Sequence, residues 1–303
     1  MVSNNSRICI FGEVLFDHFP ASEPVLGGAP FNVAWHLQAF GVQPRFISAV
    51  GADSLGEKVT NAMSEWGMDT SYLQLDKEHG TGVVDIELRD NEPVYTICDD
   101  VAYDHVNLQG LPEADDASLV YHGTLALRHE NNRETLKKLV SGKNNTLFID
   151  VNLREPWWDR DFVLAQIQGA DCVKLNSDEL QLLGGDFAPD SDESEQAAAK
   201  EFRVRNRILD LVVTRGDKGA FIVDRFGRCL PGDTPARNPN LVDTVGAGDA
   251  FSSIVILGML NGWDWRTTLC RAQEFASHIV SQQGAVCRNI AVYQDLGQRW
   301  QVR

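Results

Sequence analysis

The sequence predicts an α/β fold in which helices cover both faces of a mostly parallel sheet. Short apolar, β-rich runs alternate with stretches of helical spacing, most clearly from residue 119 onwards. Repeated strand–helix–strand units are typical of parallel sheets, because each crossover lays a helix on one face. The chain has 303 residues, of which 43% are hydrophobic, so it can build a sizeable core in one large domain or in two ordinary ones.

The first half of the chain contains strands and helices of this pattern. Residues 12–17 continue the first strand, which leaves Asp17 just past its end. Asp53 or Ser54 is expected to cap the second helix. The strands are predicted at residues 7–11, 45–50 and 72–75, and the helices at 33–40 and 55–66.

Residues 81–88 and 94–98 are predicted to form a hairpin around a turn at 90–93. The first arm alternates apolar with polar residues, which indicates one wet face, whereas the strands around it read as buried. We therefore expect the hairpin to stand away from the main sheet as a lid. An ordinary edge hairpin is the alternative.

The second half repeats the strand–helix pattern and continues into apolar helices. An acidic stretch at 186–200 begins as a surface loop and leads into a helix near residues 197–199. Residues 220–223 and 228–230 are predicted to form a second hairpin. The other strands are expected at 119–123, 146–150, 172–176 and 209–214, and the other helices at 130–140, 162–168, 177–183, 251–260 and 267–281.

The charge of the chain argues against some partners. Its 43 acidic residues outnumber 27 basic ones, for a formal net charge of -16. Nucleic acid and membrane are therefore not expected as partners, although a local basic pocket for a nucleotide is allowed. No signal peptide is visible, and no apolar run reaches about 18 residues, so no membrane span is expected. Six scattered cysteines without a C-x-x-C pair fit reduced thiols in the cytoplasm rather than a disulfide framework or a zinc site.

The loop at 246–249 is the strongest candidate for chemistry. Gly246 and Gly248 flank Ala247 and lead into Asp249, at the start of the apolar run 250–260. The first turn of a helix has unpartnered N–H groups and a partial positive charge, and glycines let an anion such as phosphate come close. A carboxylate there would repel phosphate, unless it removes a proton from the attacking group. The alternative is a glycine turn in which Asp249 only favours the helix N-terminus.

Other polar side chains follow predicted strands where those strands end. In open α/β sheets, ligands gather beyond the carboxyl ends of the strands, so these side chains are expected to surround one site. They are Asp17, Asn152 with Arg154, Asn176 with Glu179, and Thr214 with Gly216.

Several of these groups leave two interpretations open. Asn176 and Glu179 share a face at a helix start, where they could address a phosphate and a hydrated magnesium ion or could cap the helix. Arg154 could hold a hydroxyl-rich or carboxylated substrate, or be solvated. The segment from Thr214 to Gly219 could let backbone approach a ligand, or could be a hairpin turn.

A pair of glycines, Gly27 and Gly28, precedes the helix predicted at 33–40, with Asn32 in its first turns. Asn32 could hold a polar ligand or could only cap the helix locally.

Two nucleotide-binding fingerprints are absent from the sequence. There is no G-x-x-x-x-G-K-[ST], which excludes a P-loop, and no G-x-G-x-x-G opening a first βαβ unit, which weakens the case for an NAD-dependent dehydrogenase. His79, His105, His122 and His129 show no metal-ligand spacing, and each is expected to be a surface histidine or a satisfied core histidine.

Four motifs in order resemble those of the ribokinase-like (PfkB) carbohydrate kinases. The resemblance extends from Gly12 to about Ala285, and its most specific part is the run DTVGAGD at 243–249. Segments 150–157 and 81–95 look most like those of fructokinases. The other three motifs are Gly27-Gly28-x-x-x-Asn32, Asn176-x-x-Glu179 and Thr214-x-Gly216-x-x-Gly219.

The resemblance implies a three-layer α/β/α sandwich with a mostly parallel central sheet. Residues 1–303 would form a single ribokinase-like kinase domain, with a small β lid from about 13–27 and 81–105. Because the connection between Asp17 and Gly27 is short, the lid would rest mainly on the hairpin. An exposed lid also suggests a homodimer formed through it.

The resemblance further implies roles for individual residues. Asp249 would take the proton from the sugar hydroxyl, and the N–H groups of Gly246, Ala247 and Gly248 would bind the charge that develops on the γ-phosphate of ATP. The other roles divide by ligand. The sugar would be held by Asp17, Gly28, Asn32, Asn152 and Arg154, ATP by Asn176, Thr214, Gly216 and Gly219, Mg²⁺ through water by Glu179, and K⁺ by Asp243 and Val245, with Gly284 downstream.

The expected function is therefore an ATP-dependent sugar kinase that phosphorylates a primary hydroxyl, with fructose as the expected substrate. Three alternatives stay open at this point. They are a kinase for another substrate of the family (2-keto-3-deoxygluconate, ribose or a nucleoside), an NAD-dependent dehydrogenase, and a sugar-binding sensor without catalysis.

Overall fold

The computed structural model describes residues 7–18, 23–89, 92–113, 116–142, 145–185, 191–232 and 242–302. Parts of three predicted features lie outside the described residues. They are residues 19–22 of the predicted lid, residues 90–91 of the hairpin turn, and residues 186–190 of the acidic loop.

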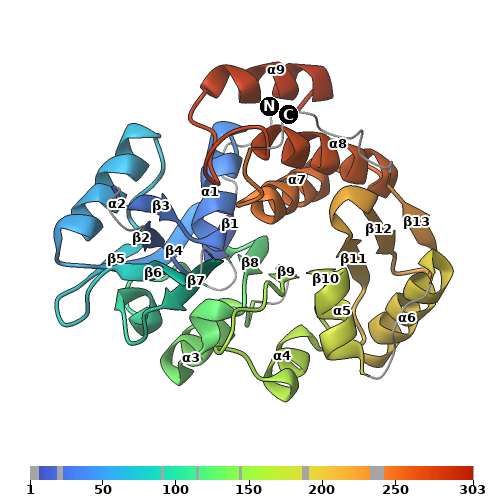
Figure 1. Ribbon diagram of the computed structural model, residues 1–303, viewed down its shortest axis with the longest axis horizontal. Helices are drawn as coiled ribbons and strands as arrows, with labels where there is room; N and C mark the ends of the chain where they lie inside the picture. Colours follow the sequence, from blue (N-terminus) through green and yellow to red (C-terminus); the bar gives the residue numbers. More distant parts are fainter. Residues whose placement is uncertain are drawn as a thin grey trace.

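Within the described residues, a nine-stranded sheet runs through the middle of the protein in the order β13-β12-β11-β10-β9-β8-β1-β4-β5 (Figure 1). Neighbouring strands from β11 to β5 are parallel, and β12 and β13 add to one edge as antiparallel strands. The strands are β1 Ile8–Phe11, β4 Arg45–Gly51, β5 Leu73–Asp76, β8 Leu119–His122, β9 Thr146–Asp150, β10 Cys172–Asn176, β11 Asp210–Thr214, β12 Ala220–Val223 and β13 Cys229–Pro231.

Helices cover both faces of this sheet, which confirms the predicted three-layer α/β/α arrangement. Ile8 and Ile10 of β1 share one core with α1, α2, α7, α8 and α9, whereas side chains of the opposite face pack against α3, α4, α5 and α6. The helices are α1 Ala29–Ala39, α2 Ser54–Glu65, α3 Glu130–Leu139, α4 Arg160–Ile167, α5 Ser177–Gly184, α6 Asp192–Arg205, α7 Ala247–Asn261, α8 Trp265–Ile279 and α9 Ile290–Trp300.

Helix α7 lies between the sheet and its neighbouring helices and is buried almost all round. Every residue from 250 to 258 is buried, as expected for a helix without a polar face. A Cβ atom at Gly258 would lie 2.6 Å from Oγ1 of Thr268 on α8. The glycine therefore lets α8 approach the second half of α7 closely.

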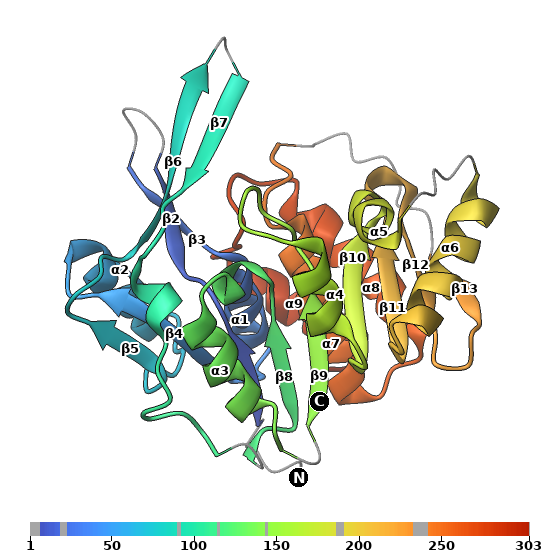
Figure 2. The ribbon, with the colours of Figure 1, turned by 90° about the horizontal axis from the view of Figure 1, so that it is seen from below.

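A second, smaller sheet stands away from the main one (Figure 2). Within the described residues it has the strand order β3-β2-β6-β7. Its strands are β2 Leu15–His18, β3 Val25–Gly27, β6 Gly82–Arg89 and β7 Glu92–Ile97. The β6–β7 hairpin pairs with β2 and not with an edge of the main sheet, so the alternative of an ordinary edge hairpin is wrong.

The position predicted for Asp17 is wrong. Asp17 does not follow the first strand of the main sheet, because β1 ends at Phe11 and Asp17 lies inside β2 of the small sheet. A Cβ atom at Gly12 would lie 2.5 Å from Cγ of Pro30, so only glycine lets the chain leave the main sheet here. The break falls at Gly12 and Glu13, between two apolar runs that look like one strand in the sequence.

Candidate active site

The glycine loop forms the first turn of α7. Gly246 is its N-cap, with a left-handed φ of 81°, and a Cβ atom there would lie 2.5 Å from Cα of Ala285. The loop thus requires glycine both for its conformation and for its packing. Ala247, Gly248 and Asp249 follow in the first turn, where backbone N–H groups have no partner within the helix. The N–H of Ala247 donates a long hydrogen bond of 3.4 Å to the Thr244 carbonyl before the helix.

Asp249 is tied to a distant part of the chain. Nδ2 of Asn32 donates a hydrogen bond of 2.7 Å to Oδ2 of Asp249. Asn32 is 4% exposed, and its Oδ1 is buried without a partner. Gly28 is the N-cap of α1 and makes no side-chain cap bond, so the alternative that Asn32 is a local cap is wrong.

The environment of Asp249 changes its acidity. Burial raises the pKa of Asp249 to about 6. The hydrogen bond from Asn32 opposes this rise, the charge of Asp150 adds to it, and the charges of Lys174 and Arg154 lower it again. A carboxylate with a pKa near 6 is a stronger base than an ordinary aspartate and is still largely ionised at pH 7.

A buried ion pair lies beneath the glycine loop. Nζ of Lys174 on β10 is 2.8 Å from both carboxylate oxygens of Asp150 on β9, and the two residues are register partners on adjacent parallel strands. Ser252 of α7 donates to Oδ2 of Asp150 at 2.6 Å. A Cβ atom at Gly248 would lie 3.6 Å from Nζ of Lys174, so a buried positive charge supports the first turn of α7. Sequence reasoning missed this pair, although a lysine inside the buried strand CVKLN is itself unusual.

Glu13 is a second group that sequence reasoning missed. It is 3% exposed, and its Oε2 is buried without a partner. Burial raises the pKa of Glu13 to about 7, while the charge of Arg154 lowers it and that of Asp249 raises it. Gly28 packs on its backbone, since a Cβ atom at Gly28 would lie 2.7 Å from the Glu13 carbonyl oxygen. A glutamate within the apolar run at 8–16 was the available signal.

The residues predicted to hold the sugar gather near Asp249. Burial raises the pKa of the half-buried Asp17, and the charge of Arg154 lowers it. Arg154 is exposed and donates to the neighbouring Leu153 carbonyl at 3.3 Å. Its positive charge acts on Glu13, Asp17 and Asp249 alike. Asn152 starts this segment with a left-handed φ of 43°, which directs the chain from the end of β9 towards these carboxyl groups.

A cavity of about 570 Å³ opens at the ends of β10 and β11. It contains predicted ATP-binding residues from both strand ends, together with acidic and basic side chains of α5, α6 and the turn after β11. Gly219 closes that turn, with its N–H bonded to the Gly216 carbonyl. The lining residues are Asn176, Ser177, Asp178, Ser191, Asp192, Glu195, Thr214, Arg215, Gly216 and Lys218. Because β11 and β12 are antiparallel, the segment is a hairpin turn and also lines a cavity.

Asn176 and Glu179 cap α5 reciprocally. Oδ1 of Asn176 accepts from the N–H of Glu179 at 2.8 Å, and Oε2 of Glu179 accepts from the N–H of Asn176 at 2.8 Å. Oε1 of Glu179 accepts from the N–H of Leu153 at 2.8 Å. The capping interpretation is therefore correct. Glu179 is 7% exposed, and each of its oxygens keeps a lone pair beyond the backbone hydrogen bond that it accepts.

The residues predicted to bind K⁺ are brought together. Oδ1 of Asp243 accepts from the N–H of Val245 at 3.0 Å, and Oδ2 accepts from the N–H of Gly284 at 3.1 Å. Asp243 thereby holds the loop before α7 against the segment that also packs on Gly246.

Comparisons with known proteins agree with this arrangement. Residues 7–289 match the pfkB family of carbohydrate kinases. The chain is 30% identical over 273 residues to the uncharacterized sugar kinase PH1459 of Pyrococcus horikoshii (84% of this chain, 82% of that protein). It is 29% identical over 275 residues to a fructokinase of Escherichia coli (85% and 84%). The crystal structure of PH1459 in complex with ATP superposes with a TM-score of 0.74 at 26% identity, covering 92% of this chain and 93% of that chain.

The matches span nearly the whole chain and define a phosphotransferase that acts on an alcohol group. The chain belongs to the PfkB family of carbohydrate kinases. The alternative of an NAD-dependent dehydrogenase is therefore wrong. No helix within the described residues is both long and apolar enough to span a bilayer.

Proposed function

We propose that the protein transfers the γ-phosphate of ATP to a hydroxyl of fructose, with Asp249 as the general base. The observation that carries this proposal is the contact between Asn32 and Asp249 at the N-terminus of α7. It fixes a raised-pKa carboxylate beside a turn suited to phosphate. The E. coli fructokinase, 29% identical, and the ATP complex of PH1459 support the choice of ligands.

In the proposed reaction, the hydroxyl oxygen of the sugar attacks the γ-phosphorus of ATP while Asp249 accepts the hydroxyl proton. The bond between the γ-phosphorus and the β–γ bridging oxygen breaks, and ADP leaves. The N–H groups of Gly246, Ala247 and Gly248 then stabilise the charge on the phosphoryl oxygens. The ammonium of Lys174 lies beneath this turn and is almost wholly buried in its ion pair with Asp150. The loop thereby combines proton removal with charge stabilisation.

ATP is placed in the cavity formed by Asn176, Thr214, Gly216 and their neighbours, with Gly219 closing the turn. Mg²⁺ would neutralise charge on the phosphates. Glu179, whose two oxygens each accept a backbone hydrogen bond, would act on it through water.

A potassium ion is proposed beside Asp243 and the carbonyl of Val245. The contacts of Asp243 with Val245 and Gly284 support this position. The test is the reaction rate in potassium-free buffer, which should fall for the natural protein. An unchanged rate would remove the potassium site.

The sugar is placed against Asp17, Gly28, Asn32, Asn152 and Arg154. Three carboxyl groups, those of Glu13, Asp17 and Asp249, face the single charge of Arg154. This balance favours a neutral sugar over a carboxylated one.

A coupled assay of ADP release across a substrate panel tests the proposal. The panel contains fructose, ribose, 2-keto-3-deoxygluconate and a nucleoside, and we expect the highest kcat/KM with fructose. ADP release with the nucleoside alone would overturn the choice of sugar. If none of the substrates caused ADP release, a sugar-binding sensor would be favoured.

We further propose a homodimer through the small sheet. Its two edge strands carry exposed apolar side chains, Val25 on β3 (41% exposed) and Tyr95 on β7 (57%). The mass by light scattering should be that of a dimer, and Tyr95→Glu should halve it. Phe226→Glu, at an aromatic side chain outside the small sheet that is more exposed still (75%), is the control. A monomeric natural protein would contradict the dimer.

Three cysteines, Cys9, Cys172 and Cys287, are buried thiols. They fit a reducing compartment, and we propose a cytoplasmic location.

A further inference from the structure

Two histidines that are far apart in the sequence meet at the base of the small sheet. His79 precedes β6, and His105 ends a short 3₁₀ helix, Ala102–His105, that follows β7. Their rings stack with centroids 3.6 Å apart and an interplanar angle of 10°. The sequence spacing gave no sign of a metal site, because the two residues converge only when the β6–β7 hairpin folds.

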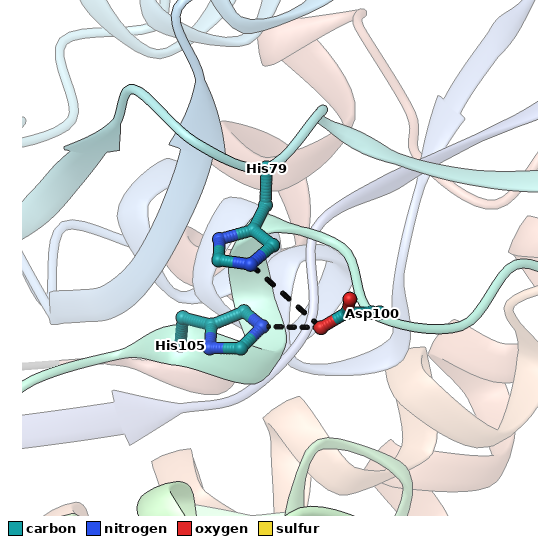
Figure 3. Close-up of side chains that lie close together, drawn as sticks. All are labelled: His79, Asp100 and His105. Atoms are coloured by element: carbon teal, nitrogen blue, oxygen red, sulfur yellow. Dashed lines mark hydrogen bonds and ion pairs between the residues drawn. The ribbon is translucent and has the colours of Figure 1, made fainter.

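An aspartate completes the group (Figure 3). Oδ1 of Asp100 lies 2.8 Å from Nε2 of His105 and 3.7 Å from Nε2 of His79. Two ligand atoms bound to one tetrahedral ion, each about 2.0 Å from it, lie about 3.3 Å apart. The two observed separations bracket that value. Asp100 has a left-handed φ of 54°, a conformation that is uncommon outside glycine and that directs its carboxylate here.

The outer contacts of His79 suit a metal ligand. Nδ1 of His79 is hydrogen-bonded to Oδ2 of Asp76 at 2.9 Å, and Oδ1 of Asp76 accepts from the N–H groups of Glu78 and His79. Asp76 therefore holds the proton on Nδ1 and turns the lone pair of Nε2 towards Asp100. Carboxylate–histidine–metal arrangements use this same contact to orient the ligand.

We propose that His79, His105 and Asp100 bind a divalent transition-metal ion such as zinc. Two imidazoles and one carboxylate are a ligand set for zinc, cobalt or nickel rather than for magnesium, which prefers oxygen. Asp100 is 67% exposed and the two histidines 23% and 30%, so solvent can supply the fourth ligand. The two rings must rotate apart from their stack to share one ion.

A neighbouring group of similar composition makes a useful contrast. Asp99, Asp104 and His129 also lie together, but Nε and Nη2 of Arg128 occupy the two oxygens of Asp104 at 2.8 and 2.6 Å. A guanidinium at that position repels a cation. His129 therefore supplies the matched control for His79 and His105.

A bound metal ion would cross-link the two ends of the β6–β7 hairpin. Residues 76–79 precede β6, and residues 100–105 follow β7, so one ion would join the two ends of the β6–β7 hairpin. This role is separate from phosphoryl transfer, and its test does not depend on the sugar or on ATP.

Titration of the full-length protein with Co²⁺, followed by absorption spectroscopy, tests the site. We expect one ion per chain, a spectrum of nitrogen and oxygen ligands without a thiolate charge-transfer band, and displacement by Zn²⁺. His79→Gln and His105→Gln should abolish binding, and Asp76→Asn should weaken it about 10–100-fold. His129→Gln should bind as the natural protein does.

The melting temperature gives an independent measurement. Zn²⁺ should raise the melting temperature of the natural protein and of His129→Gln, but not that of His79→Gln. Metal-free melting temperatures of the variants show whether they are folded. The site would be disproved if the natural protein showed no saturable binding, if His79→Gln bound normally, or if His129→Gln lost binding equally.

Discussion

At the scale of single residues, the proposed chemistry depends on how one carboxylate is held. Asp249 lies where two helices meet, and its partner Asn32 is itself almost wholly buried. Side-chain entropy is therefore already lost in the folded protein, and the carboxylate points in one direction before a substrate arrives.

Replacing Asp249 by Asn tests the base. We expect kcat to fall about 10²–10⁴-fold, because general-base catalysis typically contributes that much, while ATP binding measured by calorimetry stays unchanged. Asp264→Asn, at the N-cap of α8, serves as the control and should keep the rate. A rate for Asp249→Asn close to that of the natural protein would show that another group removes the proton.

The contact from Asn32 should set the acidic limit of activity. Its hydrogen bond lowers the pKa of Asp249, so Asn32→Ala should raise that pKa above about 6. Because the base must be ionised, the acidic limb of the profile of kcat/KM against pH should move to higher pH. Gln38→Ala removes an amide from the same helix, bonded to Gly67, and should leave the limb in place. An acidic limb unmoved in Asn32→Ala argues against Asp249 as the titrating group.

At the scale of elements, the first turn of α7 is shaped by its surroundings as much as by its own sequence. Gly246 touches Ala285, Gly248 approaches Lys174, and Asp243 bonds to Gly284. The run DTVGAGD identifies the turn in the sequence. No pattern in the neighbouring residues predicts these three contacts, because each partner is distant in the sequence.

Substitutions of the glycines at the two ends of α7 distinguish the effect of a left-handed backbone from the effect of close packing. Gly246 and Gly262 both have left-handed φ angles, 81° and 65°, but only at Gly246 does a Cβ atom meet a neighbour within 4 Å. Gly262→Ala should cost about 1–2 kcal/mol of stability and keep activity. Gly246→Ala should lose most activity as well, because the turn must move away from Ala285. Denaturant unfolding and kcat for both variants measure this, and equal activities would contradict it.

The sequence predicted most elements, and the exceptions have physical causes. The sequence pattern joins strand β2 to the first strand, because the apolar residues on either side of Gly12 and Glu13 look like one run, whereas the structure puts them in two different sheets. Helix α9 is not among the predicted elements, although its Tyr293 and Trp300 are buried against the core. Helix α6 begins at Asp192, capped by Ser191, earlier than its alanine run suggested.

The sequence predicted only those residues of the candidate site that belong to motifs. Motif residues such as Gly246, Asn32 and Thr214 carry recognisable spacing. Glu13 and Lys174 stand in strand-like apolar runs, where only their charge is unusual, and their partners come from other strands or loops. Pairings between distant segments are set by the register of the sheet, which a sequence pattern does not contain.

At the scale of the whole molecule, buried acids make stability depend on pH. The pKa of Glu13 is about 7 in the folded protein against 4.5 ordinarily. A raised carboxyl pKa favours the folded state at low pH, so this contribution is full below about pH 4.5 and is lost as the pH rises to 7. It amounts to about 3 kcal/mol, at about 1.36 kcal/mol per pH unit.

Replacing Glu13 by Gln should remove that dependence. Between pH 5 and pH 7, the free energy of unfolding of the variant should fall less steeply than that of the natural protein. Glu134→Gln, at an exposed position on α3, should behave as the natural protein does. Urea unfolding at several pH values measures the slopes, and parallel curves for Glu13→Gln would refute the assignment.

The bond between Asn32 and Asp249 joins residues 217 positions apart, and this has a consequence for synthesis on the ribosome. The amide of Asn32 leaves the ribosome early in synthesis, and the carboxylate of Asp249 leaves it late. The glycine before that carboxylate then rests on Ala285, which emerges later still. A chain that stalls or is cut short of this point contains most of the sheet but no assembled site, so the cell obtains kinase activity only from chains that are almost finished.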